Sequence, residues 1–211
     1  MDPLLLVAPL SVAAGVNLYL TVFLTGLVVR FDWAAEQLPE SLDVLGSWPV
    51  LAVAALLTTV EFFADKIPYL DNAWDLVHTF IRPAGAMLIA LNVLPEGDQA
   101  TTVSLTLLAG AGALTSHSSK AGARALVNTS PEPVSNIVVS MLEDLSVVGL
   151  MMLAFRYPWI AAGVAALLIV LLLLFLVWLV RFARRAFGGL RGFLRRRNRP
   201  PNPARAVNPG V

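Results

Sequence analysis

Long apolar runs alternate with short polar breaks along this chain, which is the pattern of a bundle of membrane helices. A helix needs about 20 consecutive, mainly apolar residues to cross a bilayer. The runs that approach or exceed this length cover residues 4–29, 49–66, 71–93, 101–127, 134–155 and 158–180. We therefore predict an all-α membrane protein with about six transmembrane helices.

Local signals set the bounds of these helices. Pro49 stands at a first helical position, where its missing N–H costs nothing, and Asp71 or Asn72 can cap the third helix. Pro83 lies inside that helix and predicts a kink. The proline-containing segment 128–133 separates the fourth and fifth helices.

The composition strengthens the membrane assignment and excludes thiol chemistry. Of 211 residues, 57% are hydrophobic and 14% are charged, whereas soluble domains average roughly 45–50% and 25%. The chain has no cysteine, so disulfides and thiolate ligands are excluded. We expect one helical transmembrane domain over residues 1–180, followed by a basic, partly disordered cytoplasmic tail over residues 181–211.

The basic residues of the tail predict the orientation. Arginines are concentrated near the C-terminus without any acidic residue among them: Arg181, Arg184, Arg185, Arg191, Arg195, Arg196, Arg197, Arg199 and Arg205. Cytoplasmic segments carry such an excess, so both ends of a six-helix chain are expected in the cytoplasm, with the protein in the cytoplasmic membrane. The tail is expected to contact anionic lipid headgroups. Nucleic acid is not an expected partner, and the oligomeric state stays open.

Polar side chains inside the apolar runs mark the candidate site. Ionisable groups are costly in hydrocarbon, and those within membrane helices usually face a bundle interior or a water-filled cavity. The candidate ion- or substrate-binding residues are Asn17, Glu61, Asp65, Asp71, Asp75, His78, Arg82, His117, Lys120, Arg124, Asn128, Asn136, Glu143 and Asp144.

Spacings of three and four residues place most of these side chains in stripes on helix faces. The stripes are Glu61 and Asp65; Asp71, Asp75, His78 and Arg82; His117, Lys120, Arg124 and Asn128; and Asn136, Ser140 and Glu143. The first two are mainly acidic and the third is basic. Since they lie at similar depth, Asp75 is expected to pair with Arg124 or Lys120.

The stripes admit several functions. The first is a small secondary transporter or permease for an ion or small polar solute, in which carboxylates bind protons or cations and His78 relays protons. The second is a non-catalytic scaffold, in which the stripes pair and fix helix packing. A metal site of Asp71, Asp75, His78 and Glu61 or Asp65 is a third, and a lipid-headgroup enzyme is a fourth. No cofactor is expected, and an enzyme is not the preferred interpretation.

An internal repeat is a further hypothesis. Glu61 lies twelve residues after Pro49, and Glu143 lies ten residues after Pro133. Two three-helix halves in series must have opposite orientations in the membrane, an arrangement common among secondary transporters. The sequence is therefore compatible with an inverted three-plus-three repeat.

Two stretches carry a resemblance to a known family. The segments Val60–Asp75 and His117–Asn136, the latter containing Ser130-Pro-Glu-Pro133, resemble the bacterial membrane family catalogued as domain of unknown function 4126. The resemblance covers about residues 4–155 and implies a multi-spanning membrane protein, without a particular activity. The segment Glu61–Lys66 is also similar to the Glu-x-Gly-Asp-Lys signature of small cation exchangers, although it has one residue more and no glycine.

Overall fold

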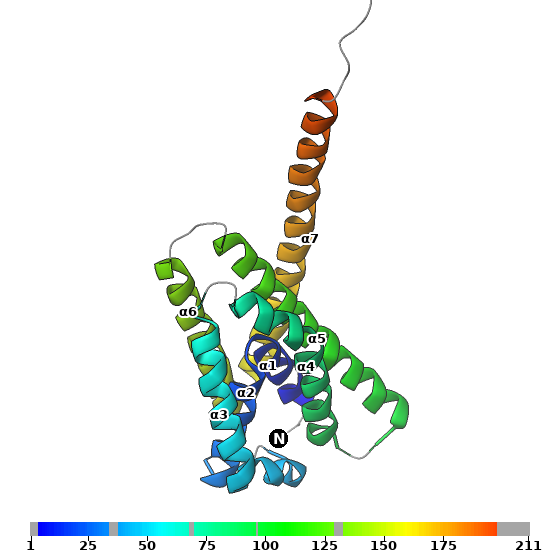
Figure 1. Ribbon diagram of the computed structural model, residues 1–211. Helices are drawn as coiled ribbons and strands as arrows, with labels where there is room; N and C mark the ends of the chain where they lie inside the picture. Colours follow the sequence, from blue (N-terminus) through cyan, green and yellow to red (C-terminus); the bar gives the residue numbers. More distant parts are fainter. Residues whose placement is uncertain (1–3, 34–37, 68–69, 96, 129–132, 198–211) are drawn as a thin grey trace, which may run out of the picture. The chain divides into compact units, whose positions relative to one another are not determined.

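The computed structural model describes residues 4–33, 38–67, 70–95, 97–128 and 133–197, and these are helical apart from turns and caps. In chain order the elements are α1 (Leu4–Val16), α2 (Leu18–Arg30), the 3-10 helix η2 (Glu40–Gly46), α3 (Trp48–Ala64), α4 (Leu70–Val93), α5 (Gln99–Val127), α6 (Pro133–Arg156) and α7 (Pro158–Arg197). The prediction of an all-α chain is confirmed for the described residues (Figure 1).

Several long apolar helices indicate a membrane protein. Three helical segments are long and apolar enough to cross a bilayer, namely Leu70–Val93, Val134–Arg156 and Pro158–Arg185. The segment formed by η2 and α3 passes the same test only as a pair, and that pair is bent by 66°. These segments give three candidate spans, or up to four, within the described residues. The six-span arrangement therefore remains a prediction.

The first apolar run does not form one continuous helix, contrary to the prediction for residues 4–29. It breaks at Asn17 into α1 and α2, each 13 residues long. Asn17 adopts an extended conformation, and its side-chain oxygen caps α2 by accepting a hydrogen bond from Leu20 N at 2.9 Å. A polar side chain that can bond to nearby backbone N–H groups competes with a continuous helix in this way.

The predicted bounds of the later helices are close to those observed, with two corrections. The helix α4 begins at Leu70, so Asp71 lies in its first turn and is not the N-cap. The helix α7 continues through Gly188, Gly189 and Gly192 to Arg197, although glycine disfavours a helix interior. The tail predicted to be partly disordered over residues 181–211 is helical up to Arg197, and its remaining residues, 198–211, lie outside the described residues.

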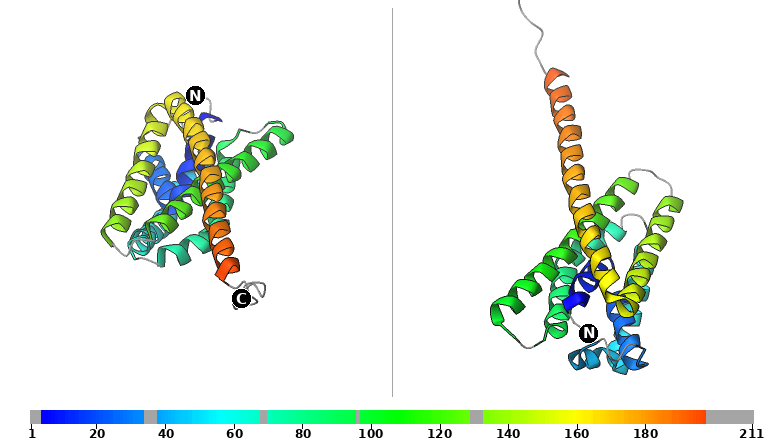
Figure 2. Two further views of the ribbon diagram at one scale, coloured as in Figure 1. Left: turned by 90° about the horizontal axis from the view of Figure 1, so that it is seen from above. Right: turned by 180° about the vertical axis from the view of Figure 1, so that it is seen from behind.

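The core of the first compact unit, Met1–Leu176, is built around α1. This helix packs against α4, α5 and α6, and Figures 1 and 2 show it between them. Its side chains Leu6, Leu10 and Ala14 are at most 1% exposed. Ser116 Oγ of α5 donates to Val12 O of α1 at 3.0 Å, so the two helices lie close together where small residues meet.

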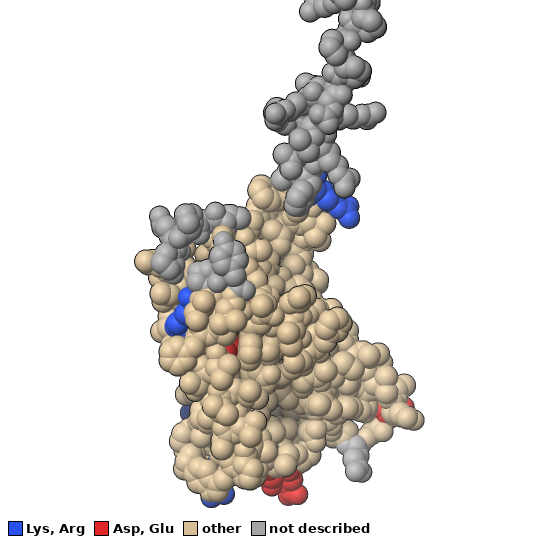
Figure 3. All heavy atoms as spheres, viewed as in Figure 1, with Lys and Arg blue, Asp and Glu red and all other residues tan. Residues whose placement is uncertain are grey.

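The surface of the bundle is mainly apolar. Figure 3 shows few charged atoms on the face of the first unit that it presents. Large side chains such as Leu88, Leu108 and Leu174 are more than half exposed, which fits helices that face lipid. The second unit, Val177–Val211, contains the C-terminal part of α7.

Candidate functional site

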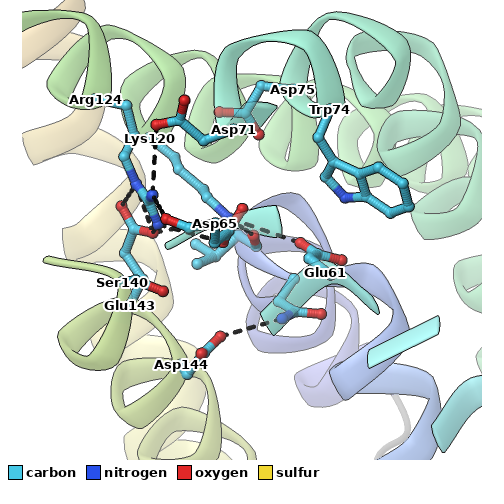
Figure 4. A network of polar contacts seen from close by, with 12 residues as sticks. Glu61, Asp65, Asp71, Trp74, Asp75, Lys120, Arg124, Ser140, Glu143 and Asp144 are labelled. Carbon is cyan, nitrogen blue, oxygen red and sulfur yellow. Dashed lines mark hydrogen bonds and ion pairs between the residues drawn. The ribbon is translucent and has the colours of Figure 1, made fainter. Parts of the chain in front are cut away.

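The charged stripes meet in the interior of the first unit, where they form direct ion pairs. We call the following residues the charged cluster (Figure 4 shows most of them): Glu61, Asp65, Asp71, Asp75, Arg82, Lys120, Arg124 and Glu143. They come from α3, the segment just after it, α4, α5 and α6. All except Glu143 are at most 5% exposed, so they are held inside the protein.

Arg82 joins α4 to three other helices. Its Nη2 lies 2.6 Å from Glu61 Oε1 of α3 and 3.4 Å from Asp75 Oδ1 of its own helix. Its Nη1 donates to Gly15 O of α1 at 3.2 Å and to His117 Nδ1 of α5 at 2.7 Å. The observed partner of Asp75 is thus Arg82, and the predicted pairing of Asp75 with Arg124 or Lys120 is wrong. The spacing of residues along one helix shows which face they share. It does not show which residues of a second helix lie at the same height in the bundle.

Lys120 is the second buried cation and pairs mainly with Asp65. Its Nζ lies 2.7 Å from Asp65 Oδ2, 3.6 Å from Glu61 Oε1 and 3.7 Å from Glu143 Oε2. It also donates to Val16 O, at the end of α1, at 3.1 Å. An ammonium group has three N–H donors, and the Val16 carbonyl accepts from one that the carboxylates leave available.

Arg124 links α5 to α6 and to the end of α3. Its Nη1 donates to the Asp65 carbonyl at 2.6 Å and to Asn136 Oδ1 at 3.2 Å. Its Nε donates to both Glu143 oxygens at 3.1 Å, and its Nη2 also pairs with Glu143. Asp71 Oδ2 lies 3.7 Å from Nη1. The planar guanidinium with five donors suits this multiple contact.

The remaining predicted polar residues border the cluster. Asn136 Nδ2 donates to the Asp65 carbonyl at 3.1 Å, and Asn128 Nδ2 donates to Asp71 Oδ2 at 2.9 Å. Asp144 lies apart from the ion pairs and accepts from Asn17 Nδ2 at 3.1 Å (Figure 4). The predicted stripes thus lie together in one region, with Asn17 and Asp144 forming a separate pair at its edge.

The contacts of the two histidines decide which nitrogen carries the proton. His78 Nδ1 lies 2.7 Å from the Trp74 carbonyl and Nε2 lies 2.9 Å from the Tyr19 hydroxyl. Since a carbonyl only accepts, Nδ1 carries the hydrogen, and Nε2 of the neutral ring accepts from Tyr19.

His117 is held in the other tautomer. Arg82 can only donate, so the Nδ1 that it contacts is an acceptor, and Nε2 donates to Thr79 Oγ1 at 3.1 Å. A second proton on His117 would set two N–H groups against each other. His117 is therefore neutral and accepts from Arg82 through Nδ1. His78 differs, because its acceptor nitrogen Nε2 faces the Tyr19 hydroxyl, which can either donate or accept a hydrogen bond.

The cluster holds more carboxylates than cations. Its five carboxylates are Glu61, Asp65, Asp71, Asp75 and Glu143, and its three cations are Arg82, Lys120 and Arg124. Lys66 and Asp144, at the edge, cancel in this count. Among the described residues, the buried carboxylate oxygens without a hydrogen-bond partner are Glu61 Oε2, Asp65 Oδ1, both oxygens of Asp75 and Asp144 Oδ2. The excess is therefore on the acidic side, and the unpaired atoms are mainly carboxylate oxygens.

Several contacting residues were not predicted. Tyr19 lies in an apolar run, and only its position two residues after Asn17 hints at the polar interior. Thr79 follows Asp75 by four residues, so a search for hydroxyls on the same face would have found it. Lys66 Nζ, next to Asp65 in sequence, binds the Phe62 carbonyl at 3.0 Å and lies 3.4 Å from Ser140 Oγ.

The metal hypothesis finds no support in the geometry. In the described part of the chain, no three histidine or acidic side chains are grouped so as to hold a metal ion. Four cavities of about 240–470 Å³ lie elsewhere, and their lining contains no member of the charged cluster. The charged groups contact one another directly, at ion-pair distances of 2.6–3.2 Å.

The fold and the cluster define a class: a helical membrane protein whose interior contains a network of buried ion pairs. The chain belongs to the family described as domain of unknown function 4126, which it matches over residues 4–181. The resemblance of residues 4–155 is thereby confirmed, and the match extends into α7. Comparison with curated proteins and with solved structures gives no match.

Proposed function

We propose that this protein is a small secondary transporter or permease for an ion or small polar solute. The supporting observation is the acidic excess of the charged cluster, with five carboxylates against three cations in a nearly unexposed interior. Unpaired charge in such a place is costly. Uptake of a proton or cation lowers this cost, so the cluster has a physical reason to bind one.

The arrangement of the helices supports a transport topology. We propose six spans in which α1 and α2 together form the first, broken span, followed by α3, α4, α5, α6 and α7. Discontinuous helices whose ends point at the binding site are a feature of secondary transporters, and the break at Asn17 lies beside Lys120 and Arg82. The inverted three-plus-three repeat belongs to the same proposal.

The basic part of α7 supports a position in an anionic leaflet, with both termini in the cytoplasm. Arg181, Arg184 and Arg185 are exposed, and Trp178 stacks on Phe182 with ring centroids 5.5 Å apart. Aromatic rings and arginines of this kind collect where a helix leaves the membrane. We propose that the tail binds lipid headgroups of the cytoplasmic membrane.

A flux assay tests the transport proposal. Purified protein in liposomes is exposed to a pH gradient and to gradients of alkali cations and small polar solutes, with internal dyes as readout. The wild type and Glu40→Gln, which alters an exposed carboxylate of η2, should show the same flux. Glu61→Gln should abolish it. Wild-type liposomes that behave like empty ones for every gradient would overturn the proposal.

A scaffold is the second candidate, and the contacts of Arg124 favour it. This side chain bonds to the Asp65 carbonyl, Asn136 and Glu143, so it fixes three segments relative to one another. A scaffold predicts that cluster variants lose stability and that no variant or wild type gives flux. The same liposomes, combined with unfolding measurements, separate the two candidates.

A further inference from the structure

Asp75 differs from the other carboxylates of the cluster. Both of its oxygens are buried without a hydrogen-bond partner, and its side chain is 5% exposed. Its nearest cationic atom is Arg82 Nη2 at 3.4 Å, which is longer than a normal hydrogen bond to a charged donor. Asp75 therefore has a weak electrostatic partner and no donor.

The other carboxylates each have a firm partner. Glu61 lies 2.6 Å from Arg82, Asp65 lies 2.7 Å from Lys120, Asp71 accepts from Asn128 at 2.9 Å, and Glu143 accepts from Arg124 at 3.1 Å. Their negative charges are stabilised by nearby donors. The charge without such stabilisation is the one on Asp75.

Arg82 cannot do for Asp75 what it does for Glu61. One terminal nitrogen is committed to Glu61, and the other donates to His117 and Gly15 O. Its Nε makes no hydrogen bond, to Asp75 or to any other described group. An ionised Asp75 would thus be a buried acceptor without donors, which is a destabilising state.

We propose that Asp75 is held as the neutral acid in this state and is the proton-binding site of the transporter, so that the transported or coupling ion is a proton. The inference rests on the proposed transport function. Binding forms one O–H bond on Asp75, breaks one on the donor water or imidazolium, and lowers the negative excess of the cluster by one charge. Release reverses this step.

A cavity gives the proton a route. It has a volume of about 240 Å³, lies between α2, η2 and α4, and includes Tyr19 in its lining. The Tyr19 hydroxyl contacts His78 Nε2 at 2.9 Å, and His78 follows Asp75 by three residues, on the same face of α4. Tyr19 gives its hydroxyl proton to His78 Nε2 as it takes one from water in the cavity. The imidazolium then gives its Nδ1 proton to the Asp75 carboxylate once that N–H turns away from the Trp74 carbonyl, which leaves a neutral ring protonated on Nε2.

The ionisable groups around Asp75 come from every neighbouring helix that carries any. They are Tyr19 of α2; Glu61 of α3 with Asp65 at its end; Asp71, His78 and Arg82 of α4; His117, Lys120 and Arg124 of α5; and Glu143 of α6. Glu40 and Asp43 of η2 are exposed. The negative neighbours favour protonation of Asp75 and the cations oppose it, so the lack of a direct donor decides its state.

Infrared spectroscopy of the purified full chain tests the inference without a flux signal. A protonated carboxyl gives a separate C=O band that shifts in D₂O. At neutral pH we expect this band in the wild type and its loss in Asp75→Asn, whereas Asp98→Asn, at an exposed helix cap, should retain it. Wild-type protein labelled with ¹³C at the aspartate side-chain carboxyl should show the same band shifted. This second measurement needs no variant to fold.

A wild-type spectrum without the band, a band that survives in Asp75→Asn, or one that the label does not shift would overturn the assignment. Tyr19→Phe removes only the hydroxyl, so it should keep the band and slow its exchange in D₂O by roughly 10²-fold; unchanged exchange would overturn the route. If the labelled band is present but the protein gives no flux, Asp75 is protonated and the transport proposal is wrong. If the protein gives flux but lacks the band, Asp75 is not the proton-binding site and the transport proposal stands.

Discussion

Glu61 of α3 and Arg82 of α4 form an ion pair of 2.6 Å in which both side chains are fully buried. The pair joins two helices that otherwise have few contacts. Removal of one partner of a buried pair leaves the other charge uncompensated and costs about 3–5 kcal/mol. The contribution of this pair can therefore be measured as a change in the free energy of unfolding.

The first prediction compares the two partners of this pair. Glu61→Gln should lower the free energy of unfolding by about 3–5 kcal/mol, and Arg82→Met should lower it further. Arg82 also contacts Asp75, His117 and Gly15 O, so its loss affects more groups. Unfolding in detergent, followed by circular dichroism, measures the difference. If Arg82→Met destabilised the protein less than Glu61→Gln, the additional contacts of Arg82 would not contribute to stability.

The second prediction concerns the shape of the Arg124 side chain. Arg124→Lys keeps the charge but cannot reproduce the bonds to the Asp65 carbonyl, Asn136 and Glu143. Each lost charge-assisted hydrogen bond is worth about 1.5–3 kcal/mol, so the midpoint of unfolding should fall to a clearly lower denaturant concentration. Arg156→Lys, at an exposed position beside Tyr157, is the matched control and should behave like wild type.

The third prediction tests the break between α1 and α2. Asn17→Ala removes the cap on Leu20 N and the donor to Asp144, so stability should fall by at least about 1 kcal/mol. Asn17→Asp retains the capping oxygen but sets a carboxylate against Asp144. We expect that variant to become more stable as the pH is lowered and the pair takes up a proton, unlike Asn17→Ala. Identical pH profiles would show that Asn17 does not contact Asp144.

The fourth prediction uses the close approach of α1 and α5. A methyl group at Gly15 would meet the Ser116 hydroxyl and the Ala113 backbone. Gly15→Ala should therefore destabilise the protein by about 1–3 kcal/mol. Gly163→Ala is the control, because nothing lies within 4 Å of the added carbon and alanine favours the helix. If both variants gave the same melting temperature, the packing of α1 on α5 would be wrong.

The fifth prediction concerns topology. Reporters fused before Met1 and after Val211 should both give the cytoplasmic signal, because the basic residues of α7 favour that side. A C-terminal reporter on the outer side would reverse the orientation. Reporters on opposite sides would rule out an even number of spans.

Periodicity alone predicted much of the helical structure, and the interior explains where it failed. The third run was expected over 71–93 and forms Leu70–Val93, because its polar face repeats at helical spacing. The break at Asn17 could not be read from the sequence, since an asparagine in an apolar run is compatible with a continuous helix. Two contacts hold it there: the local cap on Leu20 N and a tertiary hydrogen bond to Asp144, 127 positions further along the chain, which the sequence does not show.

The site was predicted in composition but not in pairing. The stripes on α4 and α5 were expected to meet, and these helices do pack together. The partner of Asp75 could not be derived, because a shift of one turn between helices changes every pair while each stripe stays the same. The unpaired oxygens of Asp75 result from this register.

The interruption at Asn17 has an electrical consequence. Leu20 N bonds to the Asn17 side chain, so the last carbonyls of α1 are released from the helix ladder. Gly15 O points to Arg82 and Val16 O points to Lys120. The negative end of the α1 dipole thus acts as a partial anion shared by two cations. One backbone position thus supplies an acceptor to both cations, so a change of conformation at Asn17 would remove one acceptor from Arg82 and one from Lys120 together.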